Sequence, residues 1–284
     1  MSSKLFKRKS QLIIGKIGEE GKLIEGLRFS FDIDMNDSAE TNKGTIRIYG
    51  ISDETKGYIE QKNSSIFINI GYGDEEFSTL FIGNIIGHEE KEEGTDKFIE
   101  ITCSDGYIPL SQKKLSLSFN SGATTKQILS RIISELNLTK GDYESIPDFV
   151  YEQGFSFVGS PSSILTKILE RIKHEWTIIN NVLIISKNNS PSTATIMQLI
   201  SEETGMISKP TRFFSKPVKK KKDTNKLIDG WKIKCLILSS LQPKMLISVK
   251  SEDVSGVFLI KNIKFSGDTH GSEWNADMEA IQRK

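Results

Sequence analysis

The stretch LRFSFDIDM, residues 27–35, alternates between apolar and polar side chains. One face carries Leu27, Phe29, Phe31 and Ile33, and the other carries Arg28, Ser30, Asp32 and Asp34. A period of two residues predicts a β-strand with one buried side and one solvent-facing side.

The rest of the first hundred residues repeats this pattern. Further runs of the same kind are GTIRIYGI, SIFINIGYG, STLFIGNIIGHE and KFIEITCSDG. Turn residues separate these runs, as at Asn36-Asp37, Gly73-Asp74 and Glu93-Gly94. A short helix fits residues 52–61, with Ser52 as its N-cap. Short strands at this spacing predict an antiparallel barrel or sandwich and argue against a parallel sheet.

The middle of the chain changes to a helical period. Thr124 and Gln127 have the spacing of a capping box, and Ser160 followed by Pro161 predicts a second helix start. The two apolar stripes behind these caps are Ile128, Leu129, Ile132, Ile133 and Leu136, and then Ile164, Leu165, Ile168, Leu169, Ile172 and Trp176. WTIINNVLIIS then predicts a hairpin that turns at Asn180-Asn181. We expect the helices to pack on this hairpin as a separate small core.

From about residue 193 the chain returns to strands. The candidate strands are TIMQLIS, DGWKIKCLILSS, MLISVKS, GVFLIKNIKFSGD and SEWNADMEAIQ. Between them, residues 216–226 (KPVKKKKDTNK) lack apolar periodicity and predict an exposed loop. The predicted fold class is a β-rich α+β protein, with strand-rich regions at residues 1–105 and 191–284 around a small α+β domain at residues 106–190.

Composition narrows the function. The chain has 284 residues, with 38 Lys+Arg against 37 Asp+Glu, so its net charge is +1. This balance argues against a dedicated nucleic-acid or acidic-membrane binder. No apolar run approaches the ~20 residues of a membrane span, and no targeting signal is recognisable. Cys103 and Cys235 stand far apart, which favours a reduced protein made in the cytosol over a disulfide or zinc framework.

Two groups of residues could suggest a metal site. His270 and Glu273 have a usable spacing, but a turn through residues 267–271 explains them better. Asp32, Asp34 and Asp37 resemble the start of a calcium loop, yet the glycine that such a loop needs at its sixth position is replaced by Asp37 itself. We therefore expect solvent-facing acids on a strand and no metal site.

No other motif predicts chemistry. Gly71-Tyr72-Gly73 lacks the third glycine of a dinucleotide fingerprint, and Gly83 and Gly87 suggest bulges or close backbone approach. No nucleophile elbow or P-loop is present. Lys219 to Lys222 lie in a chain where only seven of the 38 basic residues are Arg, which favours a solvated loop over a phosphate site. The sequence predicts no enzyme, with no catalytic residue and no cofactor, and it singles out no partner-binding residue.

Several stretches, in this order, resemble phage baseplate hub proteins, the family that joins the tail tube to the central spike. They begin with LRFSFDIDMNDSAETNKGTIRIYGISDET and LFIGNIIGHEEKEEGTDKFIEITCSDGY. The two helical stretches and the join ETGMISKPTRF follow, and the closing strands contain SGDTHGSEW at residues 266–274. Gly50 departs from the family's usual Asn.

The resemblance implies a structural protein, with residues 1–105 and 191–284 as barrel-like tube domains. It implies a homotrimer that adapts a six-fold tail tube to a three-fold central spike in a contractile tail. The implied partners are the tail tube protein and the spike protein, with the tape measure and baseplate wedge proteins as further candidates. The implied location is the virion baseplate, after assembly in the host cytoplasm.

Three alternatives stay open from the sequence. One is the hub of a contractile bacteriocin or of a secretion-system spike. The second is a cell-wall hydrolase of the tail tip, which the lack of a catalytic motif disfavours. The last is a nucleic-acid-binding barrel that uses Lys219 to Lys222, whose binding would weaken steeply with salt.

Overall fold

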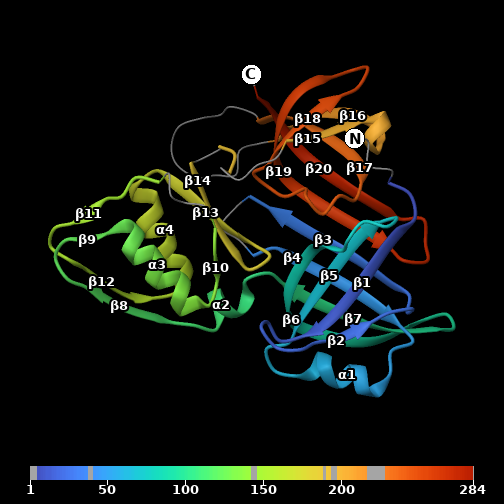
Figure 1. The fold of residues 1–284 in the computed structure, drawn as a ribbon, viewed down its shortest axis with the longest axis horizontal. Helices are drawn as coiled ribbons and strands as arrows, with labels where there is room; N and C mark the ends of the chain where they lie inside the picture. Colours follow the sequence, from blue (N-terminus) through green and yellow to red (C-terminus); the bar gives the residue numbers. More distant parts are fainter. Residues whose placement is uncertain are drawn as a thin grey trace.

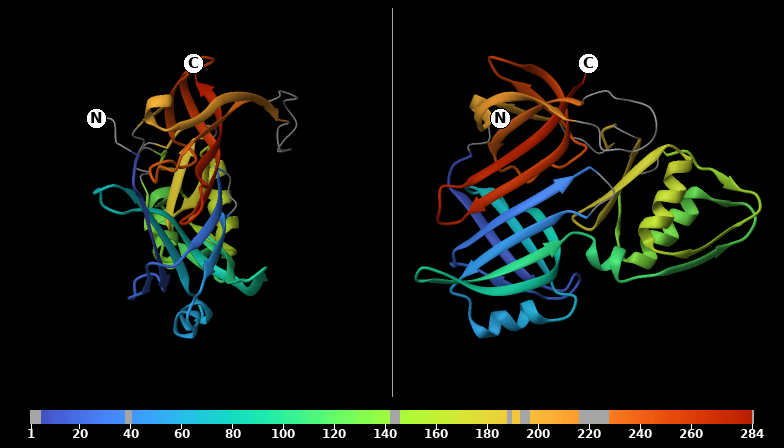
Figure 2. Two further views of the ribbon diagram at one scale, coloured as in Figure 1. Left: turned by 90° about the vertical axis from the view of Figure 1, so that its right-hand side faces the viewer. Right: turned by 180° about the vertical axis from the view of Figure 1, so that it is seen from behind.

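The structure is a computed structural model that describes residues 5–37, 41–141, 146–187, 190–192, 197–215 and 228–283. Two strand-rich regions form the body, and a smaller unit with the longer helices lies to one side (Figures 1 and 2). The predicted loop at residues 216–226 lies outside the described residues.

The N-terminal region contains the five predicted strands and the predicted short helix, together with two strands at its start that were not predicted from the sequence. Its elements are β1 (Arg8–Gly15), β2 (Lys22–Ile24), β3 (Phe29–Asn36), β4 (Lys43–Tyr49), α1 (Asp53–Glu60), β5 (Ser65–Tyr72), β6 (Ser78–Glu93) and β7 (Asp96–Ser104). On β3 the apolar residues are buried, while Asp32 and Asp34 are exposed. The Ser52 side chain accepts a hydrogen bond from the Thr55 N–H, which confirms the predicted cap of α1.

The middle region confirms both predicted helix starts. Its elements are α2 (Tyr107–Ser111), β8 (Leu115–Phe119), β9 (Ala123–Thr124), α3 (Thr125–Leu136), β10 (Thr139–Lys140), β11 (Val150–Tyr151), β12 (Phe155–Gly159), α4 (Pro161–Arg171), β13 (His174–Ile179) and β14 (Val182–Lys187). Thr124 and Gln127 form a capping box, and Ser160 caps α4 ahead of Pro161. The helices and the β13–β14 hairpin share a core of their own, as predicted. The ribbons β8–β12 and β9–β11 were not predicted.

The C-terminal region contains one strand that the sequence does not reveal. Its elements are β15 (Gln198–Ser201), the 3₁₀ turn η1 (Glu202–Thr204), β16 (Met206–Ser215), β17 (Ile228–Leu236), β18 (Leu246–Lys250), β19 (Ser255–Asp268) and β20 (Trp274–Arg283). β16 escapes prediction because MISKPTRFFS lacks alternation and contains Pro210, a residue that favours sheet edges.

The two strand-rich regions repeat one topology. The N-terminal region has the strand order β3-β4-β7-β6-β5, and the C-terminal region has the order β16-β17-β20-β19-β18. Beyond these five strands the regions differ, because β1 pairs antiparallel with β5 whereas β15 pairs parallel with β18. Each region is thus one unit built on the same order of five strands, although the two share no obvious sequence repeat. We call them the N-unit and the C-unit.

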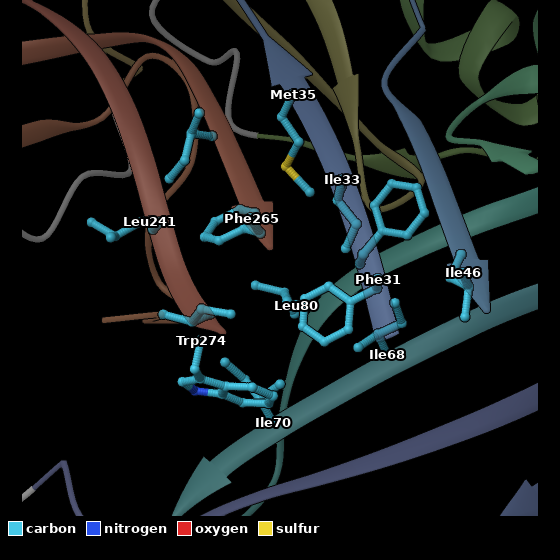
Figure 3. Close-up of a cluster of buried hydrophobic side chains, with 14 of the residues drawn as sticks. Phe31, Ile33, Met35, Ile46, Ile68, Ile70, Leu80, Leu241, Phe265 and Trp274 are labelled. Carbon is cyan, nitrogen blue, oxygen red and sulfur yellow. The ribbon is translucent and has the colours of Figure 1, made fainter. Parts of the chain in front are cut away.

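The two units do not form separate closed barrels, contrary to the expectation. Their thirteen strands form one sheet, which does not close on itself within the described residues. The cause is the length of β19: its first half pairs with β18 as far as Leu259, and its second half, Asn262–Asp268, pairs with β3. One hydrophobic core spans both units, where Phe31, Phe265 and Trp274 lie close together (Figure 3).

Candidate assembly interfaces

The residues weighed as metal ligands have structural roles. The Asp268 carboxylate accepts hydrogen bonds from the backbone N–H groups of His270 and Gly271, both at 2.9 Å, which confirms the predicted turn. His88 lies at the limit of contact with Glu60, and the ring of His174 contacts the Ile172 carbonyl at 2.6 Å. The described residues contain no group of three or more His, Cys, Asp or Glu side chains that could hold a metal.

The three acids of the calcium-like stretch lie on or beside β3. Asp32 pairs with Lys264 at 2.9 Å and accepts a hydrogen bond from Ser266, and these contacts hold its pKa below the usual value although burial opposes them. Asp34 is exposed, as predicted. Asp37 was expected to face solvent, but it is half-buried and paired with Lys261. Asp32 and Asp37 therefore serve contacts with β19.

The remaining candidate residues support packing. A Cβ at Gly83 would meet the Phe81 ring, so this glycine permits a close approach, and Gly87 follows a β-bulge in β6. Cys103 and Cys235 are both buried, and burial raises the pKa of each thiol above its usual value. Such thiols are poor nucleophiles.

The tip of the β13–β14 hairpin is locked to the N-unit by a buried carboxylate. Asp105 follows β7 and accepts hydrogen bonds from the backbone N–H groups of Asn180 at 2.6 Å and Asn181 at 3.3 Å. Both asparagines have positive φ, as a type I′ turn requires. The Asn180 side chain accepts a hydrogen bond from the Ile82 N–H of β6, and Asn42 donates to the Ile178 carbonyl. The turn is thereby fixed from three segments of the N-unit.

The other end of the hairpin contacts the C-unit. The Lys244 ammonium has a side-chain exposure of only 1% and lies 2.6 Å from the Glu175 carboxylate of β13 and 2.9 Å from Ser186 Oγ of β14. Burial lowers the pKa of Lys244, and the Glu175 contact opposes this shift. The hairpin therefore connects the middle region to both units.

A third joint connects the units directly. The Tyr72 hydroxyl, at the end of β5, donates to the Ile237 carbonyl at 2.7 Å and accepts from Trp274 Nε1 at 3.0 Å. Burial raises the pKa of Tyr72 to about 12. Arg8 lies over the Trp274 ring at 5.2 Å. Together with the β3–β19 pairing, these contacts hold the two units in one orientation.

The solvent face of the sheet carries charges that alternate in sign from strand to strand. One register row, running from β17 to β4, reads Lys234, Asp277, Lys264, Asp34 and Lys43. Neighbouring rows contain ion pairs such as Lys232–Glu279 and Arg47–Glu100. Hydrogen bonds from Lys91 and Arg47 lower the pKa of Glu100. This face neutralises its own charge and suits a surface that stays in water.

Several strand edges remain open in the described structure, including those of β2 and β15, and two of them belong to the second half of β6 and to β16. β5 pairs with β6 only as far as Asn84, so one edge of the second half of β6, Gly87–Glu93, has no partner strand among the described residues. This half forms a ribbon with β7 that projects from the body (Figure 2). β16 ends the sheet on the other side, where it pairs only with β17.

Exposed apolar side chains lie on these edges. Ile86 is 42% exposed at the base of the ribbon, and Ile207 and Phe214 on β16 are 48% and 62% exposed. Two hollows lie elsewhere: one of about 470 Å³ on the surface of α4, beside Thr166 and Glu170, and one of about 200 Å³ between the units, lined by Leu5 and Gln198 among others. The apolar strand edges are therefore better candidates for protein contact than any cavity. Of the described helices, none has the length and apolar composition that a bilayer crossing requires.

Sequence reasoning missed the residues that form the joints. Asp105 and Lys244 have partners 75 and 69 residues away along the chain, so no local spacing reveals them. The only local signal is Asp105-Gly106 at the end of a strand, and it predicts merely a turn.

Comparisons with known proteins add to this geometry. No protein-family model matches the chain, and no curated protein sequence matches it. The 43 kDa tail protein of prophage MuSo2 from Shewanella oneidensis superimposes with a TM-score of 0.63 at 13% identity, covering 96% of this chain and 98% of that one. A tail protein from Neisseria meningitidis MC58 gives 0.62 at 10% identity, covering 96% of both chains.

A third solved structure comes from a secretion machine. The E. coli c3393 protein, a component of the type VI secretion system described as structurally similar to the T4 phage tail proteins gp27 and gp5, gives a TM-score of 0.61 at 12% identity. The match covers 98% of this chain and 77% of that one. The expected likeness to baseplate hub proteins is thus confirmed at the level of the fold. The chain has the fold that phage tail proteins share with a component of the type VI secretion system.

Proposed function

We propose that this protein is a structural baseplate hub: a homotrimer that joins a six-fold tail tube to a three-fold central spike. The observation that carries the proposal is the repeated strand order of the N-unit and the C-unit. Three copies of a chain with two alike units present six alike units, so a three-fold ring can match a six-fold one. Each unit would act as one tube domain, with its sheet curved into a barrel-like wall.

The fold comparisons support a structural role over an enzymatic one. They match proteins described as tail or secretion-system components along nearly the whole chain. Residues weighed as metal ligands take part in a turn, as His270 does, or in an ion pair, as Asp32 does. On this proposal the protein resides in the virion baseplate, with the tail tube and spike proteins as its partners.

A second candidate is the equivalent hub of a secretion system or contractile bacteriocin, because the E. coli match belongs to a type VI system. The two candidates make the same physical demands on the chain. Genomic neighbours separate them: capsid and terminase genes favour a phage, and effector and immunity genes favour a secretion system.

The test is the mass of the purified protein in solution. With a chain mass of 31.9 kDa, native mass spectrometry is expected to find three chains per particle, alone or after addition of the spike protein. A monomer under both conditions, or a closed hexamer, contradicts the proposal. Zymography on the same sample tests the hydrolase alternative, and cleared cell wall would overturn the structural role.

A further inference from the structure

We propose that, in the trimer, the second half of β6 pairs antiparallel with β16 of the next copy. This contact between copies would reproduce the one that β19 makes with β3 inside each chain. The inference rests on the proposed trimer and names the residues that close its ring.

The first argument is the equivalence of β6 and β19. In the shared topology both are the long strands, flanked by β7 and β20 on one edge and by β5 and β18 on the other. β19 passes the end of β18, has a register shift between Ile260 and Asn262, and then pairs with β3 over the seven residues Asn262–Asp268. β6 passes the end of β5, has a register shift between Ile85 and Gly87, and continues for the seven residues Gly87–Glu93. The second half of β6 therefore corresponds to the second half of β19, but it has no strand paired, within the described residues, on the edge where β19 pairs with β3.

The second argument is the equivalence of β3 and β16. Each is the first strand of the shared order of five, and each pairs on one edge with the next strand, β4 or β17. The other edge of β3 receives β19, whereas the other edge of β16 is open within the described sheet. Each copy therefore has one open edge of each kind, which is what a head-to-tail ring requires.

The register of the proposed contact follows from the pairs already present. Residues paired from strand to strand form a row across each unit. In the N-unit, the row that starts at Gly87 of β6 passes through Thr102 and Thr45 and ends at Asp32 of β3. In the C-unit, the row that starts at Asn262 of β19 passes through Glu279 and Lys232 and ends at Thr211 of β16. Thr211 is therefore the counterpart of Asp32. Ser266 of β19 lies opposite Asp32 of β3. Lys91 follows Gly87 by four residues, as Ser266 follows Asn262, so Lys91 is the counterpart of Ser266. This places Lys91 opposite Thr211 of the next copy.

This register brings opposite charges together. Counting antiparallel from Lys91 and Thr211 places Glu90 opposite Arg212, and a β-bulge in β16 between Ser208 and Thr211 interrupts the register beyond that pair. Opposite charges directly across an antiparallel pair are favourable, and like charges are unfavourable. Residues 1–105 contain 20 Asp+Glu against 13 Lys+Arg, so the open edge of β6 belongs to an acidic region and suits a basic residue such as Arg212.

The contact would also cover exposed apolar surface. Phe214 is 62% exposed and falls opposite His88, two residues from the exposed Ile86. Pro210 of β16 has no backbone N–H. The proposed β6–β16 pairing therefore lacks at most one hydrogen-bond donor compared with the β19–β3 pairing. The ribbon and β16 lie apart on the strand-rich body (Figures 1 and 2), so the two edges cannot pair within one chain, and a second copy can supply the matching edge.

Disulfide trapping of the full chain tests the register. The double variant Lys91→Cys, Thr211→Cys places cysteines on directly opposed positions, where Cβ atoms lie ~4.5–5.5 Å apart. Mild oxidation is expected to give covalent trimers on non-reducing gels. The matched control Lys91→Cys, Arg212→Cys is offset by one residue, so its side chains point to opposite faces, and it is expected to give no cross-link. A trimer in which the first variant stays uncross-linked, or in which both cross-link equally, overturns the inference.

A charge exchange gives a second measurement. Glu90→Lys and Arg212→Glu are each expected to weaken trimer association by about fivefold, and the double variant is expected to restore it in part, because Arg212 also pairs with Asp229 of its own chain. Glu20→Lys, an equal charge change in the β1–β2 turn, serves as the control and is expected to leave association unchanged. If the native chain is trimeric but the double variant fails to recover, this inference is wrong and the proposed function stands. If the native chain forms no trimer, the proposed function itself fails.

Discussion

At the scale of single residues, Asp105 is the group on which the position of the middle region depends most. Its carboxylate is buried and accepts two N–H groups of the Asn180-Asn181 turn. Burial raises the pKa of Asp105 to about 7, although these hydrogen bonds oppose the shift. The unfolded carboxyl titrates near pH 3.9. The contribution of this group to stability is therefore full below about pH 4 and is lost as the pH rises towards 7.

The variant Asp105→Asn is predicted to remove this pH dependence, because the amide resembles the protonated carboxyl and does not titrate. Relative to the native protein, the variant is expected to gain at least ~1.4 kcal/mol in free energy of unfolding between pH 4 and 8, the equivalent of one pKa unit. Urea unfolding at both pH values measures this difference. Stability curves that stay parallel across this range would mean that Asp105 is ionised in the folded protein throughout.

Tyr72 offers a test of the direct joint between the units. Tyr72→Phe removes the hydroxyl that bonds both the Ile237 carbonyl and Trp274 Nε1, and leaves two buried polar groups without this partner. The expected loss is about 1–3 kcal/mol in free energy of unfolding. Tyr49→Phe is the control, with an expected change within about 0.5 kcal/mol. Equal effects of the two variants would show that the joint contributes no stability.

At the scale of elements, α4 joins the core of the middle region through its apolar stripe. Leu169 is fully buried there, and Leu169→Ala is predicted to cost about 2–5 kcal/mol through lost transfer energy and a cavity. The adjacent Glu170 is exposed, so Glu170→Ala is expected to change stability by less than about 0.5 kcal/mol. Thermal unfolding of both variants measures the difference. An unchanged melting temperature for Leu169→Ala would mean that this core is not formed.

Elements with a local signal could be predicted, and those that depend on distant partners could not. The caps Ser52, Thr124 and Ser160 and the Asn180-Asn181 turn are local chemistry, and all were predicted correctly. β16 lacks an alternating pattern and takes its conformation from pairing with β17. The ribbons of the middle region are short, and their pairs are long-range. The candidate interfaces escaped prediction for the same reason, because an open edge is a property of the assembled sheet.

At the scale of the whole molecule, the repeated unit is the feature that links fold to function. The order of strands is the same in both units, yet the units are joined in one sheet because β19 extends beyond β18. The sequence reveals two strand-rich ends, but equivalence between them lies in strand order and not in residue identity. The solvent face carries charges of alternating sign, in keeping with a chain that has 26% charged residues and a net charge of +1.

The central claim is that three copies supply six alike units to a tail tube, and a cryo-EM reconstruction of the assembled particle tests it most directly. The proposed account predicts three copies of this chain in one ring, with N-units and C-units alternating around it and in contact with a six-fold tube ring on one side. Six copies per particle, or a ring in which only one of the two units contacts the tube, would contradict it.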